Sequence, residues 1–285
     1  MAGWSKLGVM AGGGELPVVL AEHLAASGRP YFIARVEGMA DPALDAHPGE
    51  TFGLGLMGAR IHAVRAAGCD AITIIGQVSR PDLSTLKLDE AAYQMMPAIL
   101  AAMSQGDDAL LRAVLSEHEK AGFRVVGVDE AMSELLAPAG VWGDVQPTAK
   151  QLNDVKKAAR VAAAVGSFDI GQGVIVCDGL VLTVEAQEGT DAMLKRAAEL
   201  PLTIRGSETA RRGVLVKRPK PIQERRIDLP TIGVRTIEGA ARAGLAGVAV
   251  EANGALAVRR AEIIAAADRA GLFVYGFAPD EADAP

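Results

Sequence analysis

Cysteine, histidine and long apolar runs are scarce in this chain of 285 residues, and each shortage argues against a class of protein. The two cysteines, Cys69 and Cys177, lie far apart inside apolar runs and have no CxxC spacing, so we expect buried free thiols rather than a disulfide scaffold or a zinc site. The four histidines show no HExxH or paired spacing, which disfavours a transition-metal site. No apolar run reaches the length of about 18 residues that would span a membrane.

Aromatic residues and positive charge are also in short supply. Phe, Trp and Tyr make up 4% of the chain, too few for an RNA-binding surface of stacked aromatic side chains. The net charge is −6 and the isoelectric point is about 5.4, so a broad basic face for nucleic acid is not expected. The amino-terminal residues MAGWSKLGVMAGGG lack the regions of a signal peptide, and we expect a cytoplasmic protein that does not bind nucleic acid.

What the chain does contain is a globular composition, with 50% hydrophobic and 22% charged residues. In the first half, short apolar strands alternate with helical patterns, which is typical of an α/β domain with a Rossmann-like, doubly wound parallel sheet. The predicted strands cover residues 6–11, 31–36, 70–76 and 123–128, and the predicted helices cover residues 15–26, 58–67 and 107–121.

The second half is organised differently. Residues 137–150 hold two prolines and two glycines and break every period, so we interpret them as a linker between domains at 1–136 and 151–285. Asp178-Gly179 predicts a β-hairpin between residues 173–177 and 180–186, and Ala252-Asn253-Gly254 predicts another between 247–251 and 255–258. With helices expected over 151–164, from about 191 and over 259–270, and strands over 213–217 and 272–277, this half predicts an α+β domain with a mixed sheet.

Two motifs in the first half follow predicted strands. Gly12-Gly13-Gly14 connects a strand to a helix, where backbone N–H groups approach a phosphate, although the spacing is G-x-G-x-x-P rather than a full dinucleotide fingerprint. Gln77, Ser79 and Arg80 follow the strand at 70–76, beyond whose carboxyl end a ligand binds in open α/β sheets. An ordinary tight βα turn and an ordinary polar loop explain the same residues.

A carboxylate-rich motif, EAQEGTD at residues 185–191, ends the first predicted hairpin. Thr190 and Asp191 suit the cap and first turn of a helix, but Glu185 late in an apolar strand requires a partner or a function. Oxygen ligands of this kind suit Mg²⁺. Directly before the hairpin, DIGQG at residues 169–173 predicts a tight bend beside a ligand, since two glycines flank Gln172.

The only strong local cluster of positive charge lies between residues 217 and 226, where five basic residues fall within ten positions. Phosphate is the natural partner of such a cluster, and Asp228, which follows it, is a candidate general base or metal ligand. A solvated basic loop with a salt-bridged aspartate explains the same pattern. Thr236 is interpreted as the N-cap of the next helix.

Five runs together resemble the LpxI-type UDP-2,3-diacylglucosamine pyrophosphatases, in order over nearly the whole chain. They are KLGVMAGGGELP from residue 6, IGQVSRPD from 75, GDDALLRAV from 106, DIGQGVIVCDGLVLTVEAQEGTDAML from 169 and KPIQERRIDLPTIGVRTI from 220. The EAQEGTD and DLPTIG blocks are the specific ones. The resemblance implies a lipid A biosynthesis enzyme of a Gram-negative bacterium, which uses Mg²⁺ to hydrolyse UDP-2,3-diacylglucosamine to UMP and 2,3-diacylglucosamine 1-phosphate.

The resemblance also implies two domains with the substrate bound between them, and it identifies Asp228 with the essential aspartate of the family. We expect catalytic roles for Asp228, Glu188 and Asp191, and metal binding by Asp228, Glu185 and Asp191. The residues expected to contact the substrate are Gly12, Gly13, Gln77, Ser79, Gln172, Gly173, Thr190, Lys217, Lys220 and Thr236.

Two other functions stay open at this point. A NAD(P)-dependent oxidoreductase is suggested by the glycine turn, but the fingerprint is incomplete and no clear acidic residue ends the second strand, where Glu37 is the candidate. A non-catalytic nucleotide-binding regulator would bind its ligand without turnover. Because a diacylated substrate resides in the bilayer, we expect peripheral contact with the cytoplasmic face of the inner membrane, through an apolar patch or the basic loop, and a homodimer is a further expectation.

Overall fold

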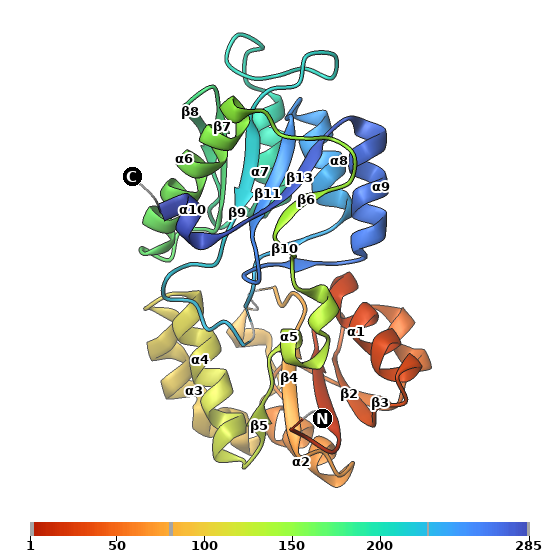
Figure 1. Ribbon diagram of the computed structural model, residues 1–285. Helices are drawn as coiled ribbons and strands as arrows, with labels where there is room; N and C mark the ends of the chain where they lie inside the picture. Colours follow the sequence, from red (N-terminus) through yellow and green to blue (C-terminus); the bar gives the residue numbers. More distant parts are fainter. Residues whose placement is uncertain (1–2, 80–81, 227, 284–285) are drawn as a thin grey trace. The chain divides into compact units, whose positions relative to one another are not determined.

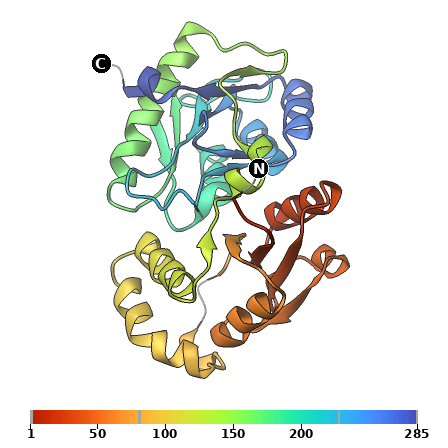
Figure 2. The same cartoon turned by 60° about the horizontal axis from the view of Figure 1, so that its bottom comes forward.

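The computed structural model describes residues 3–79, 82–226 and 228–283 (Figures 1 and 2). The chain forms two compact units. Unit 1 consists of Met1–Ser133 and Glu224–Asp228, and unit 2 consists of Glu134–Gln223 and Leu229–Pro285. The predicted linker at residues 137–150 includes strand β6 (Gly140–Trp142) of the unit 2 sheet. The chain therefore leaves unit 1 before this segment, and it returns to unit 1 for five residues late in the sequence.

Unit 1 contains the expected parallel sheet. Five strands lie in the order β3-β2-β1-β4-β5, and every pair is parallel. Consecutive apolar residues in β1 and β4 are almost all buried, as the strand pattern predicts for a sheet covered on both faces. The strands are β1 (Leu7–Ala11), β2 (Tyr31–Val36), β3 (Gly49–Phe52), β4 (Ala71–Ile75) and β5 (Arg124–Val125).

Helices cover both faces of this sheet. Figures 1 and 2 show α1 on one side and α3 with α4 on the other. The core on the second side joins Met10 and Ile72 of the sheet to Val64 of α2 and Leu115 of α4. The helices are α1 (Glu15–Ala26), α2 (Met57–Ala66), α3 (Glu90–Met103), α4 (Asp107–Lys120) and α5 (Val128–Ala131), with short 3₁₀ turns at Pro42–Ala46, Leu83–Thr85 and Ser133–Leu135.

Sequence patterns missed parts of unit 1. Strand β3 carries two exposed residues in its four and has no apolar run to reveal it. Helix α3 was not predicted, and it contains Pro97 in its interior. The strand predicted over residues 123–128 is shorter than expected, because Val128 begins helix α5.

Unit 2 contains the expected mixed sheet, with six strands in the order β6-β13-β11-β9-β7-β8. Its central strands β9, β11 and β13 are parallel, whereas β6, β7 and β8 pair antiparallel with their neighbours. The remaining strands are β7 (Gly173–Cys177), β8 (Leu180–Val184), β9 (Val214–Lys217), β10 (Thr231–Ile232), β11 (Gly247–Glu251), β12 (Leu256–Ala257) and β13 (Phe273–Phe277).

The two faces of the unit 2 sheet pack against different helices. On one face Val174 and Val216 pack against α6, and on the other Ile175 and Leu215 pack against α7, α8 and α9. Figure 1 shows α6 and α9 on opposite sides of the sheet. The helices are α6 (Ala149–Gly166), α7 (Gly189–Ala198), α8 (Val234–Arg242), α9 (Arg260–Ala270) and α10 (Pro279–Asp283).

One of the two predicted hairpins is confirmed and the other is wrong. Strands β7 and β8 pair antiparallel, and Asp178 and Gly179 both have positive φ, at 52° and 80°, as a type I′ turn requires. Around Asn253 the chain also turns, but β11 is already paired with β9 and β13. Strand β12 therefore cannot pair with β11, and it forms a separate two-stranded sheet with β10.

Candidate functional site

The glycine turn and the Gln77 loop, separate in the sequence, come together at the carboxyl ends of β1 and β4. Gly13 and Gln77 exchange two backbone hydrogen bonds of 2.8 Å, and Gly12 N donates to Ile75 O at 2.9 Å. A Cβ at Gly12 would lie 2.5 Å from Gln77 O, and one at Gly13 would lie 2.8 Å from Met39 O. Both positions therefore require glycine because of close backbone approach. The loop uses the N–H groups of Gly12 and Gly13 itself, and Gly12 is buried, so a ligand at this turn would meet the partly exposed Gly13.

The side chains that follow β4 face solvent. Gln77 and Ser79 are both exposed, so they are accessible to a ligand at this end of the unit 1 sheet. Arg80 lies outside the described residues. On the neighbouring strand β2, Glu37 N donates to Phe52 O of β3 at 2.9 Å, and the Glu37 side chain is exposed. The unit 1 strand ends thus expose an amide, a hydroxyl and, at Glu37, a carboxylate.

In unit 2, Glu185 is a buried carboxylate with a hydrogen-bond partner, as its position late in an apolar strand predicts. It directly follows β8, is 6% exposed, and accepts a hydrogen bond from the Thr190 hydroxyl at 2.5 Å through Oε1. Oε2 is buried and has no hydrogen-bond partner among the residues that the structure describes. Thr190 is the second residue of α7, so its prediction as an N-cap was wrong: the chain turns at Glu188, and the hydroxyl serves the carboxylate. The amino terminus of α7 favours the negative charge beside it.

The DIGQG motif makes room for this carboxylate. A Cβ at Gly173 would lie 2.7 Å from Glu185 Oε2, and a Cβ at Gly171 would lie 2.0 Å from Glu185 O. Both glycines are therefore needed for close approach to Glu185. Gln172 between them accepts a hydrogen bond from Gln223 through its side chain at 3.3 Å. The DIGQG and EAQEGTD motifs therefore form one cluster.

Lys217 lies across Gly173 from Glu185. Gly173 pairs with Lys217 in β9, and its carbonyl accepts from Glu185 N at 2.8 Å, so the three residues form one row across three strands. Residues opposite each other in a sheet point to the same face, which here is the face covered by α7 and α8. Lys217 is 5% exposed, and its Nζ donates to Thr231 O at 3.2 Å. The buried carboxylate of Glu185 and the buried amino group of Lys217 thus flank Gly173.

Thr236 is buried on α8, the helix that follows Thr231. The prediction that Thr236 is the N-cap was wrong, because it is the third residue of α8. Its hydroxyl accepts a hydrogen bond from Gly233 N at 3.4 Å. The helix cap is Gly233, which has no side chain to donate or accept, so the threonine three positions on supplies the hydrogen bond instead.

The basic cluster is largely neutralised by carboxylates. Arg218 pairs with Glu251 at 3.1 Å in a buried ion pair that sequence reasoning missed, and Lys220 pairs with Asp169 at 2.6 Å. Arg226 pairs with acidic side chains of unit 1. Lys217 differs because its Nζ donates to a neutral backbone carbonyl, Thr231 O. The group that its Nζ contacts therefore does not offset its positive charge.

Asp228 belongs to unit 1 and is half-buried. Its N–H donates to Glu224 O at 3.1 Å, which closes a turn over residues 224–228. The other predicted catalytic acids lie at the start of α7: Glu188 pairs with Arg196 at 2.5 Å, and Asp191 pairs with Arg235 at 2.5 Å. Both are more exposed than Glu185.

The predicted magnesium ligands do not form a cluster of three. Within residues 3–79, 82–226 and 228–283, no three His, Cys, Asp or Glu side chains gather as a metal-binding group. Glu185 fits an oxygen ligand best, because its buried Oε2 has no hydrogen-bond partner and Gly173 leaves space in front of it. Asp191 fits less well, since Arg235 already holds one of its oxygens.

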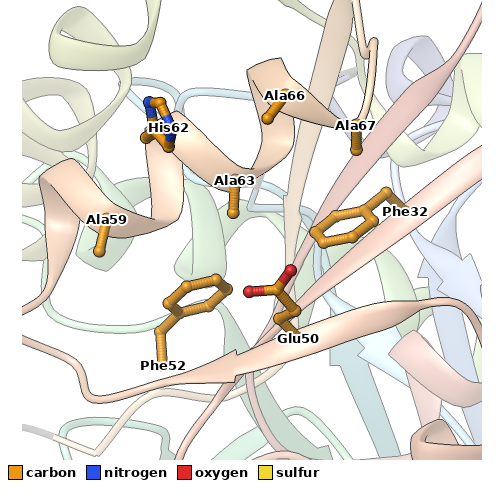
Figure 3. Close-up of a pocket in the computed structure, with 8 residues that line it drawn as sticks. All are labelled: Phe32, Glu50, Phe52, Ala59, His62, Ala63, Ala66 and Ala67. Atoms are coloured by element: carbon orange, nitrogen blue, oxygen red, sulfur yellow. The ribbon is translucent and has the colours of Figure 1, made fainter.

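Of two cavities in the structure, one lies away from the predicted site residues and the other includes Asp191. Figure 3 shows the first, of about 510 Å³, between α2 and the β2–β3 edge of unit 1, where Phe32 and Phe52 face small residues of the helix and Glu50 and His62 supply polar atoms. None of the predicted site residues lines it. The second, of about 500 Å³, lies between α7 and α8 and is lined by charged residues that include Asp191 and Arg235.

Other expectations concern the chain as a whole. Cys69 and Cys177 are free and buried, as predicted, and burial raises the pKa of Cys69 to about 11. Neither thiol is therefore an activated nucleophile. Among the described residues, no helix is both long and apolar enough to cross a membrane.

Comparison with known proteins covers both halves of the chain. Residues 6–135 match the family model of the LpxI N-terminal domain, and residues 138–275 match that of the LpxI C-terminal domain. The chain is 54% identical over 276 residues to a Caulobacter vibrioides protein named UDP-2,3-diacylglucosamine pyrophosphatase LpxI, covering 97% of this chain and 99% of that protein.

A solved structure described as a putative NAD-dependent epimerase/dehydratase from Methylobacillus flagellatus matches 50% of this chain and 44% of its own, at 14% identity. Its TM-score of 0.24 is too low to support an argument about fold or cofactor. The two family models, in contrast, match consecutively and span most of the sequence. The chain belongs to the LpxI family.

Proposed function

We propose that this protein hydrolyses the pyrophosphate of UDP-2,3-diacylglucosamine to UMP and 2,3-diacylglucosamine 1-phosphate, a step of lipid A biosynthesis. The observation that carries the proposal is the 54% identity over nearly the full length of both chains to a curated pyrophosphatase of that substrate. Family membership favours this hydrolase over the oxidoreductase and over a binding protein without turnover.

The reaction replaces one bridging P–O bond with a bond to water. Water oxygen attacks a phosphorus, the bridging bond breaks with its electrons going to the leaving phosphate, and the water proton passes to a base. Negative charge on the phosphates must be stabilised during the attack. The buried Lys217 ammonium supplies positive charge at the end of the unit 2 sheet, and Asp228 is the base that we propose takes the proton.

We include Mg²⁺ in the proposal. Glu185, through its unpaired Oε2, and Asp228 are the residues that would hold it. When bound, the ion would neutralise phosphate charge. Glu188 and Asp191, both at the start of α7, would orient water or the metal from their ion-paired positions.

We further propose that the substrate touches both units, because expected contact residues occur in each. Gly12, Gly13, Gln77 and Ser79 lie in unit 1, and the other expected contacts lie in unit 2. The second group consists of Gln172, Gly173, Thr190, Lys217, Lys220 and Thr236.

A diacylated substrate also motivates the proposal of peripheral contact with the cytoplasmic face of the inner membrane of a Gram-negative bacterium. Large apolar side chains are exposed on each unit: Tyr93 (70%) and Leu100 (52%) on α3, and Phe168 (78%) after α6. Such exposed side chains are suited to an apolar interface or to a homodimer. Fractionation of lysate at low and high salt tests the membrane contact, and protein that stays wholly soluble at every salt concentration would contradict it.

The activity is tested with purified protein and UDP-2,3-diacylglucosamine, with and without Mg²⁺, by measuring UMP release. We expect release of UMP with Mg²⁺ and its loss after exhaustive EDTA treatment, with recovery when Mg²⁺ is returned. A fluorescence titration with NADH serves as the control for the oxidoreductase alternative. Absence of UMP together with saturable NADH binding would overturn the proposal.

A further inference from the structure

The turn that carries Asp228 is anchored on helix α4 of unit 1. Glu224 N donates a 2.7 Å hydrogen bond to Asp108 Oδ1, and Asp228 N donates to Glu224 O at 3.1 Å. Asp108 is the second residue of α4, where the helix N-terminus favours a negative charge. Asp108 is thus linked to the backbone of Asp228 through one intervening residue.

We call the hydrogen bond from Glu224 N to Asp108 the anchor of the turn, and ion pairs hold the side chains of both residues. Arg112, one turn further along α4, donates to Asp108 Oδ2 at 2.6 Å and lies 3.7 Å from Glu224 Oε2. Arg226, inside the turn, donates to both oxygens of Glu224 at 3.0 Å and reaches Glu119 of α4 at 2.8 Å. These contacts lower the pKa of Glu224 and raise the pKa of Arg112 and Arg226, so all three stay charged near neutral pH.

The carboxylates of the anchor are buried, unlike an ordinary surface ion pair. The Asp108 and Glu224 side chains are 11% and 13% exposed, whereas the carboxylate of the neighbouring Glu117–Lys120 pair on the same helix is 26% exposed and its lysine 67% exposed. Removing one member of a buried, hydrogen-bonded network leaves its partners unsatisfied, while an exposed pair contributes little. The network therefore fixes the geometry of the turn rather than serving solubility.

We propose that Asp108 is a positioning residue for Asp228. By accepting the Glu224 N–H, it fixes where the 224–228 turn begins and so where the Asp228 carboxylate stands. This inference rests on the proposed function, since it concerns the efficiency of the same hydrolysis. It predicts that the loss of Asp108 lowers kcat, because a reacting group displaced by about 1 Å costs on the order of 10²-fold in rate.

The test compares Asp108→Ala and Asp108→Asn with wild type, and uses Glu117→Ala as the matched control on α4. We expect Asp108→Ala to lower kcat by about 10²-fold with KM changed less than about threefold. Asp108→Asn keeps an acceptor for Glu224 N–H, and the half-exposed Arg112 can turn to solvent, so we expect kcat within roughly fivefold of wild type. Glu117→Ala removes only a more exposed ion pair that does not contact the 224–228 turn, and it should leave both constants unchanged.

Hydrogen exchange of the 224–228 backbone is a second readout that does not depend on turnover. We expect faster exchange of these amides in Asp108→Ala than in wild type, and normal exchange in Asp108→Asn and Glu117→Ala. Unchanged exchange in Asp108→Ala would overturn the anchor. Faster exchange with wild-type kcat would overturn the positioning role. A wild-type protein that releases no UMP would instead refute the proposed function, a result distinct from both.

Discussion

The strand ends of the two units differ in what fixes their geometry. In unit 1, Gly12, Gly13 and Gln77 are joined by backbone hydrogen bonds, and close approach leaves no space for side chains. In unit 2, Glu185 and Lys217 are buried charges that face each other across Gly173. Substitutions should therefore act through steric fit in unit 1 and through electrostatics in unit 2.

Asp228 is the main test of this division, because it is a carboxylate of unit 1. We expect Asp228→Asn to lower kcat by about 10²–10⁴-fold, since an amide cannot take the proton from water. The change is isosteric and should leave Tm and KM close to wild type. Measured kcat, KM and thermal unfolding check this. A kcat near that of wild type would show that the charged residues of unit 2 are sufficient for catalysis without the Asp228 carboxylate.

Glu185→Gln should lower activity while maintaining or raising stability. The variant keeps an acceptor for Thr190 and removes a buried charge whose Oε2 has no partner, a change that is often neutral or stabilising. We expect a loss of about 10²-fold in kcat and a higher Mg²⁺ concentration for half-maximal rate. Glu199→Gln, at an exposed carboxylate of unit 2, is the control. A drop in Tm with unchanged activity would assign Glu185 a structural role.

Gly12→Ala tests the steric half of the comparison. Its Cβ would lie 2.5 Å from Gln77 O, so β1 and the Gln77 loop must separate, at a cost of about 1–3 kcal/mol in unfolding free energy. Denaturant unfolding measures the loss. Gly233→Ala in unit 2 is the matched control, because a Cβ there meets nothing within 4 Å. Equal stability of the two variants would contradict the close approach.

The smallest effect should come from pH, and it should arise in unit 1, which contains all four histidines. Burial lowers the pKa of His118, so folded His118 is neutral and unfolding takes up a proton below about pH 6.5. Stability should be fully present above that pH and fall as pH decreases through it.

Thermal unfolding between pH 7.5 and 5.5 measures this slope in wild type and in His118→Leu, which removes the titrating ring. We expect a smaller decrease of Tm with falling pH in the variant. His62→Gln, at an exposed position of α2, should retain the wild-type slope. An identical slope in all three proteins would show that His118 does not contribute.

A turn signal in the sequence predicted the pairing correctly where no distant strand takes the place beside it. Asp178-Gly179 forms the predicted hairpin because β9 occupies one side of β7 and the other side takes the edge strand β8. The Asn253 turn carried a similar signal, but both edges of β11 were occupied. Pairing of distant strands decides such cases, and a turn motif does not contain that information.

In the candidate site too, contacts between distant parts of the chain could not be predicted from the sequence. The position of Glu185, late in an apolar strand, correctly indicated a buried carboxylate with a partner. The row that joins it to Lys217 depends on which strands are neighbours, and the anchor between Asp108 and Glu224 joins residues 116 positions apart. A single sequence shows the residue types of such contacts but not their pairing.

The return of residues 224–228 to unit 1 has a consequence for biosynthesis. Asp108 is synthesised 116 residues before Glu224, so at about 5–20 residues per second roughly 6–23 s pass before the backbone N–H that it accepts is made. During that interval the α4 surface exposes its buried carboxylate to water, and most of unit 2 has emerged before unit 1 can be completed. The last steps of folding in the first-made unit therefore depend on the second.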